Sequence, residues 1–414
     1  GSKFHVVYSS KQAPGLITDV LVFDAKTIPK RQAAIKAMIQ GYVDGLAYMR
    51  SHPDESAEII GKVLGVSAAE AKAQMSGVYN IPLAEMGKNF ERSDATSSFF
   101  GSGAVNQLAA MAEADVVVNG ISGFSALAPL IASLKAGKRV ALANKESVVC
   151  GKALLDETIL EYKGELLPVD SEQSAIFQCM QNGRKEEVER LILTASGGPF
   201  WQKPRAELEH ITVEQALAHP TWNMGKKLTL DSATLFNKGL EVIEAAYLFD
   251  IPAEQIEVVI HPQSIVHSMV AYLDGTCMAN MSKPDMRLPI QYAITYPERK
   301  PSSCTPLKLY LEQPLSFHQP DLERFHSLKL AYDALDAGKS VPLAYNGANE
   351  AAVEAFCKGE IGFLDIERVV DYTLSSHTPV ELTRLEDIVE ADRLVRILAN
   401  QTINRLAQER RNAH

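Results

Sequence analysis

The spacing of hydrophobic and polar residues predicts alternating strands and helices over about residues 105–195. Short apolar runs that end in polar or glycine-rich residues predict four strands, at 115–119, 139–143, 166–170 and 191–195. Apolar residues at helical spacing lie between these runs. This alternation is typical of α/β proteins with parallel strands. Because ligands bind at the carboxyl ends of the strands in open α/β sheets, we expect a site where these strands end.

The second half of the chain shows a different pattern. An amphipathic helix is predicted over 234–248, followed by strand-like segments at 257–260 and 265–270. From about residue 327 the apolar spacing predicts mostly helices. We therefore expect the chain to end in a helical domain.

Composition narrows the function classes. The 414 residues are 46% hydrophobic and 22% charged, which is ordinary for a globular protein with a large core. The net charge of −10 argues against nucleic acid as a partner. The five cysteines form no CxxC pair, so we expect a reduced, cytoplasmic chain without a zinc site. No apolar run approaches the ~18 residues that a membrane span needs, so no membrane partner is expected.

Two carboxylates flank a serine directly after the third predicted strand, in the order Asp170, Ser171, Glu172. Alternation along an extended chain would place Asp170 and Glu172 on the same side. Two hard oxygen ligands suit Mg²⁺ or Mn²⁺ better than Zn²⁺. The residues alone leave a second interpretation open, which is a polar turn after a buried strand.

The predicted helix over 234–248 carries a polar group at helical spacing. Asn237 and Glu241 are four residues apart and Lys238 and Glu241 are three apart, so all three share one face. Glu241 alone would be interpreted as an ordinary surface carboxylate, and the neighbouring Asn237 and Lys238 reverse that interpretation.

Seven motifs in fixed order resemble the 1-deoxy-D-xylulose 5-phosphate reductoisomerase family over about residues 105–414. That family acts in the methylerythritol phosphate route to isoprenoids. The motifs are Ala143-Asn-Lys-Glu-Ser147, Val169-Asp-Ser-Glu172, Ser196-Gly-Gly-Pro-Phe200, His219-Pro-Thr-Trp-Asn-Met-Gly225, Asp231-Ser-Ala-Thr234, Asn237-Lys-Gly-Leu-Glu241 and His261-Pro-Gln-Ser264.

The resemblance implies a role for each group of residues. The ligands of one Mg²⁺ or Mn²⁺ would be Asp170, Glu172 and Glu241. The phosphate of a small sugar substrate would be bound by Ser196, Ser232, Asn237 and Lys238. The rest of the substrate would contact Lys145, Ser171 and His219. A mobile flap would contain Trp222 and Met224. The nicotinamide end of NADPH would face Asn144, Glu146 and Gly225.

Several of these residues also have structural interpretations. Ser232 would cap a helix, Ser196 would serve a turn, and His219 and Trp222 would be part of the core. At Gln173 the chain departs from the histidine that the family leads us to expect beside the metal ligands.

The first quarter of the chain departs from the family. Residues 5–100 resemble part of a periplasmic solute-binding protein of the nitrate/taurine/sulfonate type, through Ser9–Val22, Ile39–Tyr42 and His52–Ala57. The family's Gly-x-Thr-Gly-x-x-Gly turn, which binds the NADPH pyrophosphate, has no counterpart; Gly101-Ser-Gly103 is a near match without a preceding clear strand. We interpret the chain as a chimera, with a highly diverged natural first half as the alternative, and expect weak NADPH binding. For the function, the alternative to a reductoisomerase is a chimeric sugar-phosphate- and metal-binding protein without turnover.

Together these patterns predict an α/β fold with an incomplete or altered Rossmann-like N-terminal domain, an α/β catalytic domain and a helical C-terminal domain. The expected segments are a solute-binding-protein-like part at 1–104, the rest of the Rossmann-like domain at 105–165, the catalytic domain at 166–300, a linker at 301–326 and the helical domain at 327–414. The resemblance also implies a homodimer.

Overall fold

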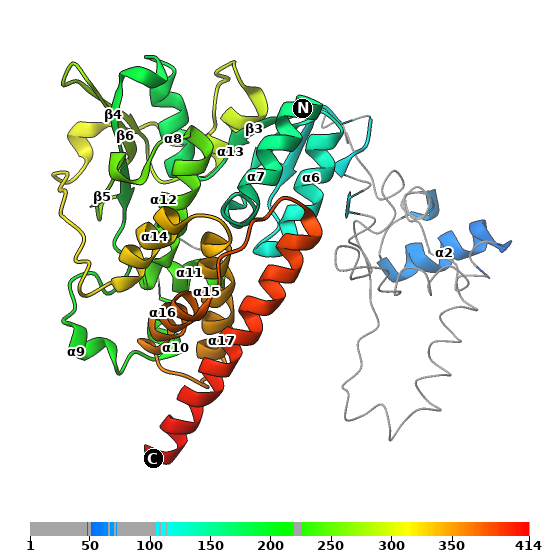
Figure 1. The fold of residues 1–414 in the computed structure, drawn as a ribbon. Helices are drawn as coiled ribbons and strands as arrows, with labels where there is room; N and C mark the ends of the chain where they lie inside the picture. The colour runs from blue at the N-terminus through cyan, green and yellow to red at the C-terminus, as the bar shows by residue number, and fades with distance from the viewer. Residues whose placement is uncertain are drawn as a thin grey trace. The chain divides into compact units, whose positions relative to one another are not determined.

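The computed structural model divides the chain into two compact units, Gly1–Met111 and Ala112–His414. The residues that it describes are 48, 51–64, 67–69, 72, 105–106, 109–112, 114–218 and 225–413. The first unit contains the helix α2 (Pro53–Leu64; Figure 1), which begins at a proline, a residue that the first turn of a helix tolerates. The solute-binding-like strands before residue 24 and the glycines at 101 and 103 lie outside the described residues.

The second unit begins with a three-stranded parallel sheet. Its order is β1 (Val116–Asn119), β2 (Arg139–Leu142), β3 (Glu165–Pro168). The connections contain α6 (Leu127–Lys135) and α7 (Lys145–Tyr162), which pack against each other. These elements confirm the strands and helices that the apolar spacing predicts in this region.

The fourth predicted strand lies in a separate sheet. β4 (Val188–Ala195) pairs in parallel with β5 (Ile256–Ile260) and antiparallel with β6 (Val266–Tyr272), and β7 (Cys277–Met281) forms the far edge. The helix α8 (Ser171–Met180) follows β3 and packs on β6 and β7. The carboxyl ends of β3 and β4 therefore belong to two sheets that α8 connects.

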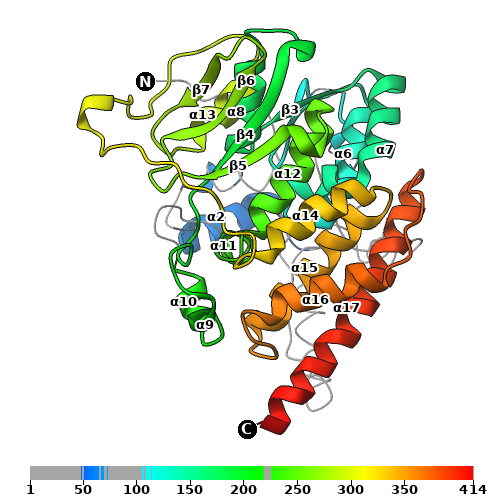
Figure 2. The ribbon, with the colours of Figure 1, turned by 60° about the vertical axis from the view of Figure 1, so that its left-hand side comes forward.

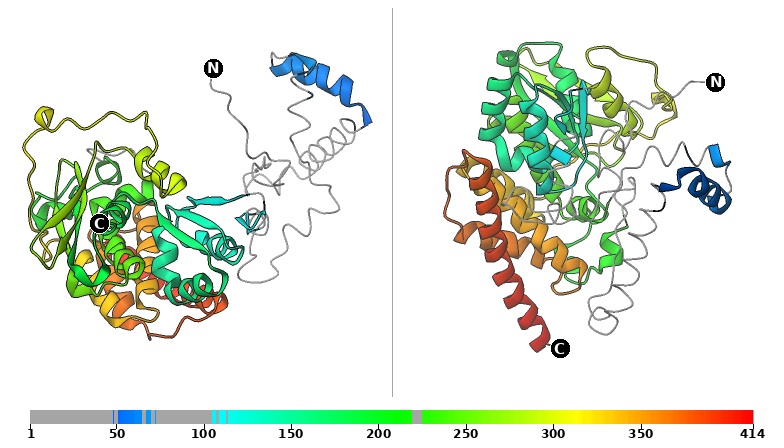
Figure 3. Two further views of the ribbon diagram at one scale, coloured as in Figure 1. Left: turned by 90° about the horizontal axis from the view of Figure 1, so that it is seen from above. Right: turned by 90° about the vertical axis from the view of Figure 1, so that its right-hand side faces the viewer.

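Helices fill the space beside the second sheet, as Figures 2 and 3 show. The long ones are α12 (Phe236–Phe249), α14 (His326–Ala337), α15 (Val341–Cys357), α16 (Asp365–Ser376) and α17 (Leu385–Ala413). The shorter elements of the second unit are η2 (Phe124–Ala126), η3 (Lys185–Glu187), α9 (Arg205–Leu208), α10 (Val213–Ala216), α11 (Lys226–Ala233), η4 (Ala253–Gln255), α13 (Arg287–Thr295) and η5 (Leu309–Leu311). The helical C-terminal part is thus confirmed from His326 onward.

One glycine of α12 allows close packing with the C-terminal helices. A Cβ atom on Gly239 would lie 2.1 Å from the hydroxyl of Tyr345 and 2.9 Å from Cβ of Ala331. Tyr345 is fully buried, and its hydroxyl donates a hydrogen bond to the carbonyl of Ser327 at 3.1 Å. This contact holds α12, which carries three of the predicted site residues, against α14 and α15.

Among the described residues, no helix is both long and apolar enough to cross a membrane.

Candidate active site

Asp170 and Glu172 meet because a helix begins between them. Asp170 is the N-cap of α8, and its carboxylate accepts a hydrogen bond from the backbone N–H of Glu172 at 3.2 Å. Glu172 therefore lies in the first helical turn. The expectation of an extended chain with alternating side chains is wrong here, because the aspartate satisfies a free N–H at the start of α8.

Glu241 completes a cluster of three carboxylates. One oxygen each from Asp170, Glu172 and Glu241 lie within 4.8 Å of one another. Glu241 comes from the middle of α12, and Asn237 and Lys238 both donate to its carboxylate. The predicted common face of these three residues is confirmed, and it points at the start of α8.

Lys145, the first residue of α7, contacts two members of the cluster. Its Nζ donates to Asp170 Oδ2 at 2.5 Å, to Glu241 Oε1 at 2.8 Å and to Asn237 Oδ1 at 2.9 Å. Lys238 Nζ donates to Glu172 Oε1 at 3.1 Å and also to Glu241. Three carboxylates thus share two ammonium groups as ion-pair partners.

Burial and charge act in opposite directions on the pKa values in this cluster. Burial lowers the pKa of Lys145, but the carboxylates of Asp170 and Glu241 raise it well above its ordinary value. Burial also opposes ionisation of Asp170, yet Lys145 holds its pKa below the usual range. For Glu172, burial and the neighbouring Glu241 carboxylate raise the pKa to about 8.

A cavity of about 220 Å³ opens beside the carboxylates. Each predicted metal, phosphate or substrate residue that the structure describes lines it. These residues are Lys145, Asp170, Ser171, Glu172, Ser196, Ser232, Asn237, Lys238 and Glu241. The predicted residues His219, Trp222 and Met224 lie outside the described residues.

Two glycines bring the ends of β4 and α11 together on one wall of this cavity. Gly197 and Gly198 have φ angles of +88° and +67°, in the left-handed region that favours glycine. A Cβ atom on Gly198 would lie 2.5 Å from the carbonyl oxygen of Ser232. The close approach places Ser196 and Ser232 on the same cavity.

None of the three residues predicted to face NADPH, which are Asn144, Glu146 and Gly225, lines that cavity. Asn144 caps α7 by accepting from the N–H of Ser147 at 2.9 Å, and its amide donates to Glu146 at 2.8 Å. Gly225 is the N-cap of α11. Asn144 therefore has a structural role in addition to the predicted one.

A buried ion-pair network extends from Glu146. Lys227 lies 2.8 Å from both Glu146 and Asp231, and Asn349 of α15 donates to Asp231 at 2.9 Å. Burial raises the pKa of Glu146, but Lys227 brings it below its ordinary value. No role was predicted for Lys227 or Asp231 from the sequence. Their spacing of four on one helix was the available signal.

His267 of β6 was also missed. It lines the cavity, and its Nε2 lies 2.7 Å from the hydroxyl of Ser282. Burial lowers its pKa to about 4, so the imidazole is neutral at physiological pH. Nothing in its local sequence distinguishes it from a core residue of a strand.

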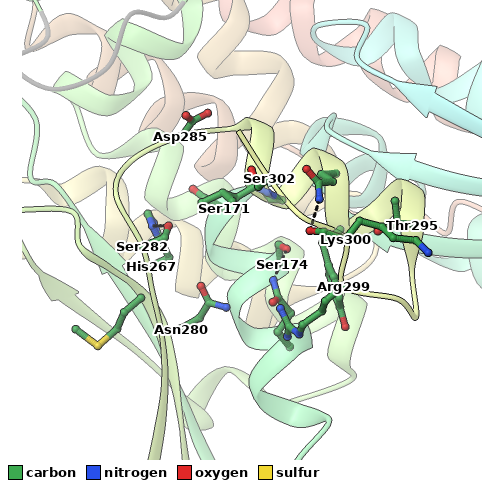
Figure 4. Close-up of a pocket in the computed structure, with 16 residues that line it drawn as sticks. Ser171, Ser174, His267, Asn280, Ser282, Asp285, Thr295, Arg299, Lys300 and Ser302 are labelled. Atoms are coloured by element: carbon green, nitrogen blue, oxygen red, sulfur yellow. Dashed lines mark hydrogen bonds between the residues drawn. The ribbon is translucent and has the colours of Figure 1, made fainter. Parts of the chain in front are cut away.

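A second cavity of about 220 Å³ lies between α8, β7 and α13 and shares Ser171 and His267 with the first (Figure 4). Its walls are mainly hydroxyl and amide side chains. The guanidinium of Arg299 lies over the ring of Tyr292, 4.7 Å from its centre. Both cavities thus meet at the start of α8.

Models of one family match three parts of the chain. The 1-deoxy-D-xylulose 5-phosphate reductoisomerase model matches residues 66–152, its C-terminal domain model matches 166–249, and a DXP reductoisomerase C-terminal domain model matches 281–398. A reductoisomerase from Chlorobium chlorochromatii is 52% identical over 301 residues, which cover 72% of this chain and 78% of that protein. The chain belongs to the 1-deoxy-D-xylulose 5-phosphate reductoisomerase family. A relative from Geobacter metallireducens is 53% identical over 280 residues, covering 68% of this chain and 73% of that protein.

Solved reductoisomerase structures share this fold. The enzyme from Zymomonas mobilis in complex with NADPH is 43% identical, with a TM-score of 0.69 and coverage of 73% of this chain and 78% of that one. A complex with NADPH, fosmidomycin and magnesium is 39% identical, with a TM-score of 0.70 and coverage of 78% and 84%. The first family match begins at residue 66, inside the segment that we interpreted as a solute-binding-protein lobe.

Proposed function

We propose that this member of the reductoisomerase family converts 1-deoxy-D-xylulose 5-phosphate to 2-C-methyl-D-erythritol 4-phosphate with NADPH and a divalent metal. The observation that carries the proposal is the convergence of Asp170, Glu172 and Glu241 on one cavity with Lys145 and Lys238. These three carboxylates come from two helices and converge on one cavity, whereas ordinary surface carboxylates point into solvent separately.

The donor set fits Mg²⁺ or Mn²⁺. Both ions prefer oxygen ligands, and the three carboxylate oxygens are close enough to be drawn onto one ion. The residues that would hold it are Asp170, Glu172 and Glu241. A divalent ion there would supply Lewis-acid polarisation of the substrate's carbonyl and hydroxyl oxygens.

Four further residues of the cavity lining suit a phosphate. Ser196, Ser232 and Asn237 offer neutral polar groups, and Lys238 adds one positive charge. Lys145 and Ser171 would contact the substrate between the phosphate and the metal ligands. For the segment with His219 and Trp222, we propose contact with the substrate and exclusion of water.

The nicotinamide end of NADPH would lie against Glu146 and Gly225, with Asn144 holding the Glu146 carboxylate in place. Lys227 keeps this carboxylate ionised in a buried position. The pyrophosphate-binding part would have to come from residues before 105, where the sequence has no glycine-rich fingerprint. We do not retain the chimeric, non-catalytic alternative, because the match to the family model begins at residue 66, within the segment 1–104.

The direct test is NADPH oxidation with 1-deoxy-D-xylulose 5-phosphate and Mn²⁺. We expect turnover that requires the metal and is lost in Glu241→Gln. The matched control is Glu187→Gln, which alters an exposed carboxylate paired with Arg184. Metal-independent turnover, or equal activity in Glu241→Gln, would contradict the proposal. We further propose a homodimer in the cytoplasm, which light scattering and cell fractionation would test.

A further inference from the structure

The ammonium group of Lys145 uses the same carboxylates as the proposed metal site. Its three hydrogen bonds go to Asp170 Oδ2, Glu241 Oε1 and Asn237 Oδ1, at 2.5, 2.8 and 2.9 Å. The side chain is only 8% exposed. An ammonium group has three donors, so Lys145 makes its full set of hydrogen bonds inside the cluster.

The remaining carboxylate oxygens are engaged as well. Asp170 Oδ1 accepts from the backbone N–H of Glu172 at 3.2 Å, and Glu241 Oε2 accepts from Lys238. A divalent ion needs lone pairs of these same oxygens, at about 2.0–2.1 Å for Mg²⁺. It would then lie within a few ångströms of the Lys145 ammonium, where two cations in a buried site repel strongly.

We propose that Lys145 is an internal competitor of the divalent metal. Its ammonium neutralises Asp170 and Glu241, the metal displaces it from them, and the displaced ammonium becomes available to the substrate. The metal therefore binds before Lys145 can contact the substrate. This inference rests on the metal site of the proposed function. It predicts that removing the Lys145 ammonium strengthens metal binding. If Lys145 only supported the metal ligands, removing it would weaken metal binding.

The test is a titration of the full chain with Mn²⁺, without substrate or NADPH. The electron paramagnetic resonance signal of free Mn²⁺ measures how much of the ion remains unbound. We expect Lys145→Met and Lys145→Gln to bind Mn²⁺ at least ~10-fold more tightly than the wild type, a difference of about 1.4 kcal/mol. The control is Lys152→Met. Lys152 lies on the same helix as Lys145, but its partner Asp156 is exposed, whereas Asp170 is largely buried. Its Mn²⁺ affinity should stay within ~2-fold of the wild type. Unchanged or weaker Mn²⁺ binding in the Lys145 variants would overturn the competition.

Thermal unfolding gives a second measurement that does not depend on activity. Removing the ammonium takes the paired counter-charge from the largely buried Asp170 and leaves Glu241 with Lys238 alone, so the variants should lose stability without Mn²⁺ and gain more from it than the wild type. An equal or smaller Mn²⁺-induced rise in Tm would also overturn the proposal. The variant Glu241→Gln distinguishes failure of the metal site from failure of the competition by Lys145. If it binds Mn²⁺ like the wild type, the metal site itself is wrong. If it loses Mn²⁺ while the Lys145 variants also bind more weakly, only the competition is wrong.

Discussion

Replacing Gly198 by alanine should destabilise the second unit and separate Ser196 from Ser232. The new Cβ would lie 2.5 Å from the carbonyl oxygen of Ser232 and 3.1 Å from Cα of Ala233. Both are backbone atoms, so the clash cannot be relieved by turning the end of a side chain. The φ angle of +67° adds strain for any residue with a Cβ.

The magnitude follows from these two contributions. A left-handed conformation costs an L-residue roughly 1–2 kcal/mol, and overpacking of a tight contact typically costs about 1–3 kcal/mol. We therefore expect Gly198→Ala to lower the free energy of unfolding by about 2–5 kcal/mol. Because the loop and α11 must move apart, KM for the phosphorylated substrate should rise as well.

Gly359→Ala provides the matched control. Gly359 has a similar φ of +73°, but a Cβ there would meet no atom within 4 Å. Only the conformational cost remains, so we expect a loss of roughly 1–2 kcal/mol with unchanged KM. Urea unfolding followed by far-ultraviolet circular dichroism would give both values. Equal losses in the two variants would refute the argument that close approach to Ser232 requires glycine.

The metal ligands, a buried histidine and the cofactor each give a further prediction. Glu241→Gln should weaken Mn²⁺ binding at least ~10-fold, the scale on which altered metal sites respond, and calorimetry showing unchanged affinity in a folded variant would disprove the ligand assignment. His267 has a folded-state pKa of about 4, against an ordinary value of 6.5. As the pH falls, His267 is therefore protonated first in the unfolded chain, and the free energy of unfolding should fall by up to about 3 kcal/mol between pH 6.5 and pH 4. His267→Gln should lack this part of the pH dependence in thermal unfolding, and an unchanged profile would be evidence against a buried neutral imidazole. Without the glycine-rich turn, NADPH should bind at least ~100-fold more weakly than micromolar, because two or three charge-assisted hydrogen bonds are missing; a micromolar KM for NADPH would reveal a dinucleotide site without that fingerprint.

The local elements and the candidate chemistry of the second unit could be predicted from the residues alone. Apolar spacing located β1, β2 and β4, because the period of a strand or helix depends on neighbouring residues alone. Helical spacing also placed Asn237, Lys238 and Glu241 on one face, as the structure has them. The order of the motifs indicated the family that the comparisons then established.

How these elements meet depends on contacts between distant parts of the chain. Asp170 and Glu172 converge through the cap of α8 rather than through an extended chain, a choice made by the free N–H groups at the helix start. Lys145 reaches Glu241, 96 residues away, and His267 reaches the cavity from a different sheet. Such contacts depend on packing between elements far apart in the chain, and no local period records which side chains that packing brings together.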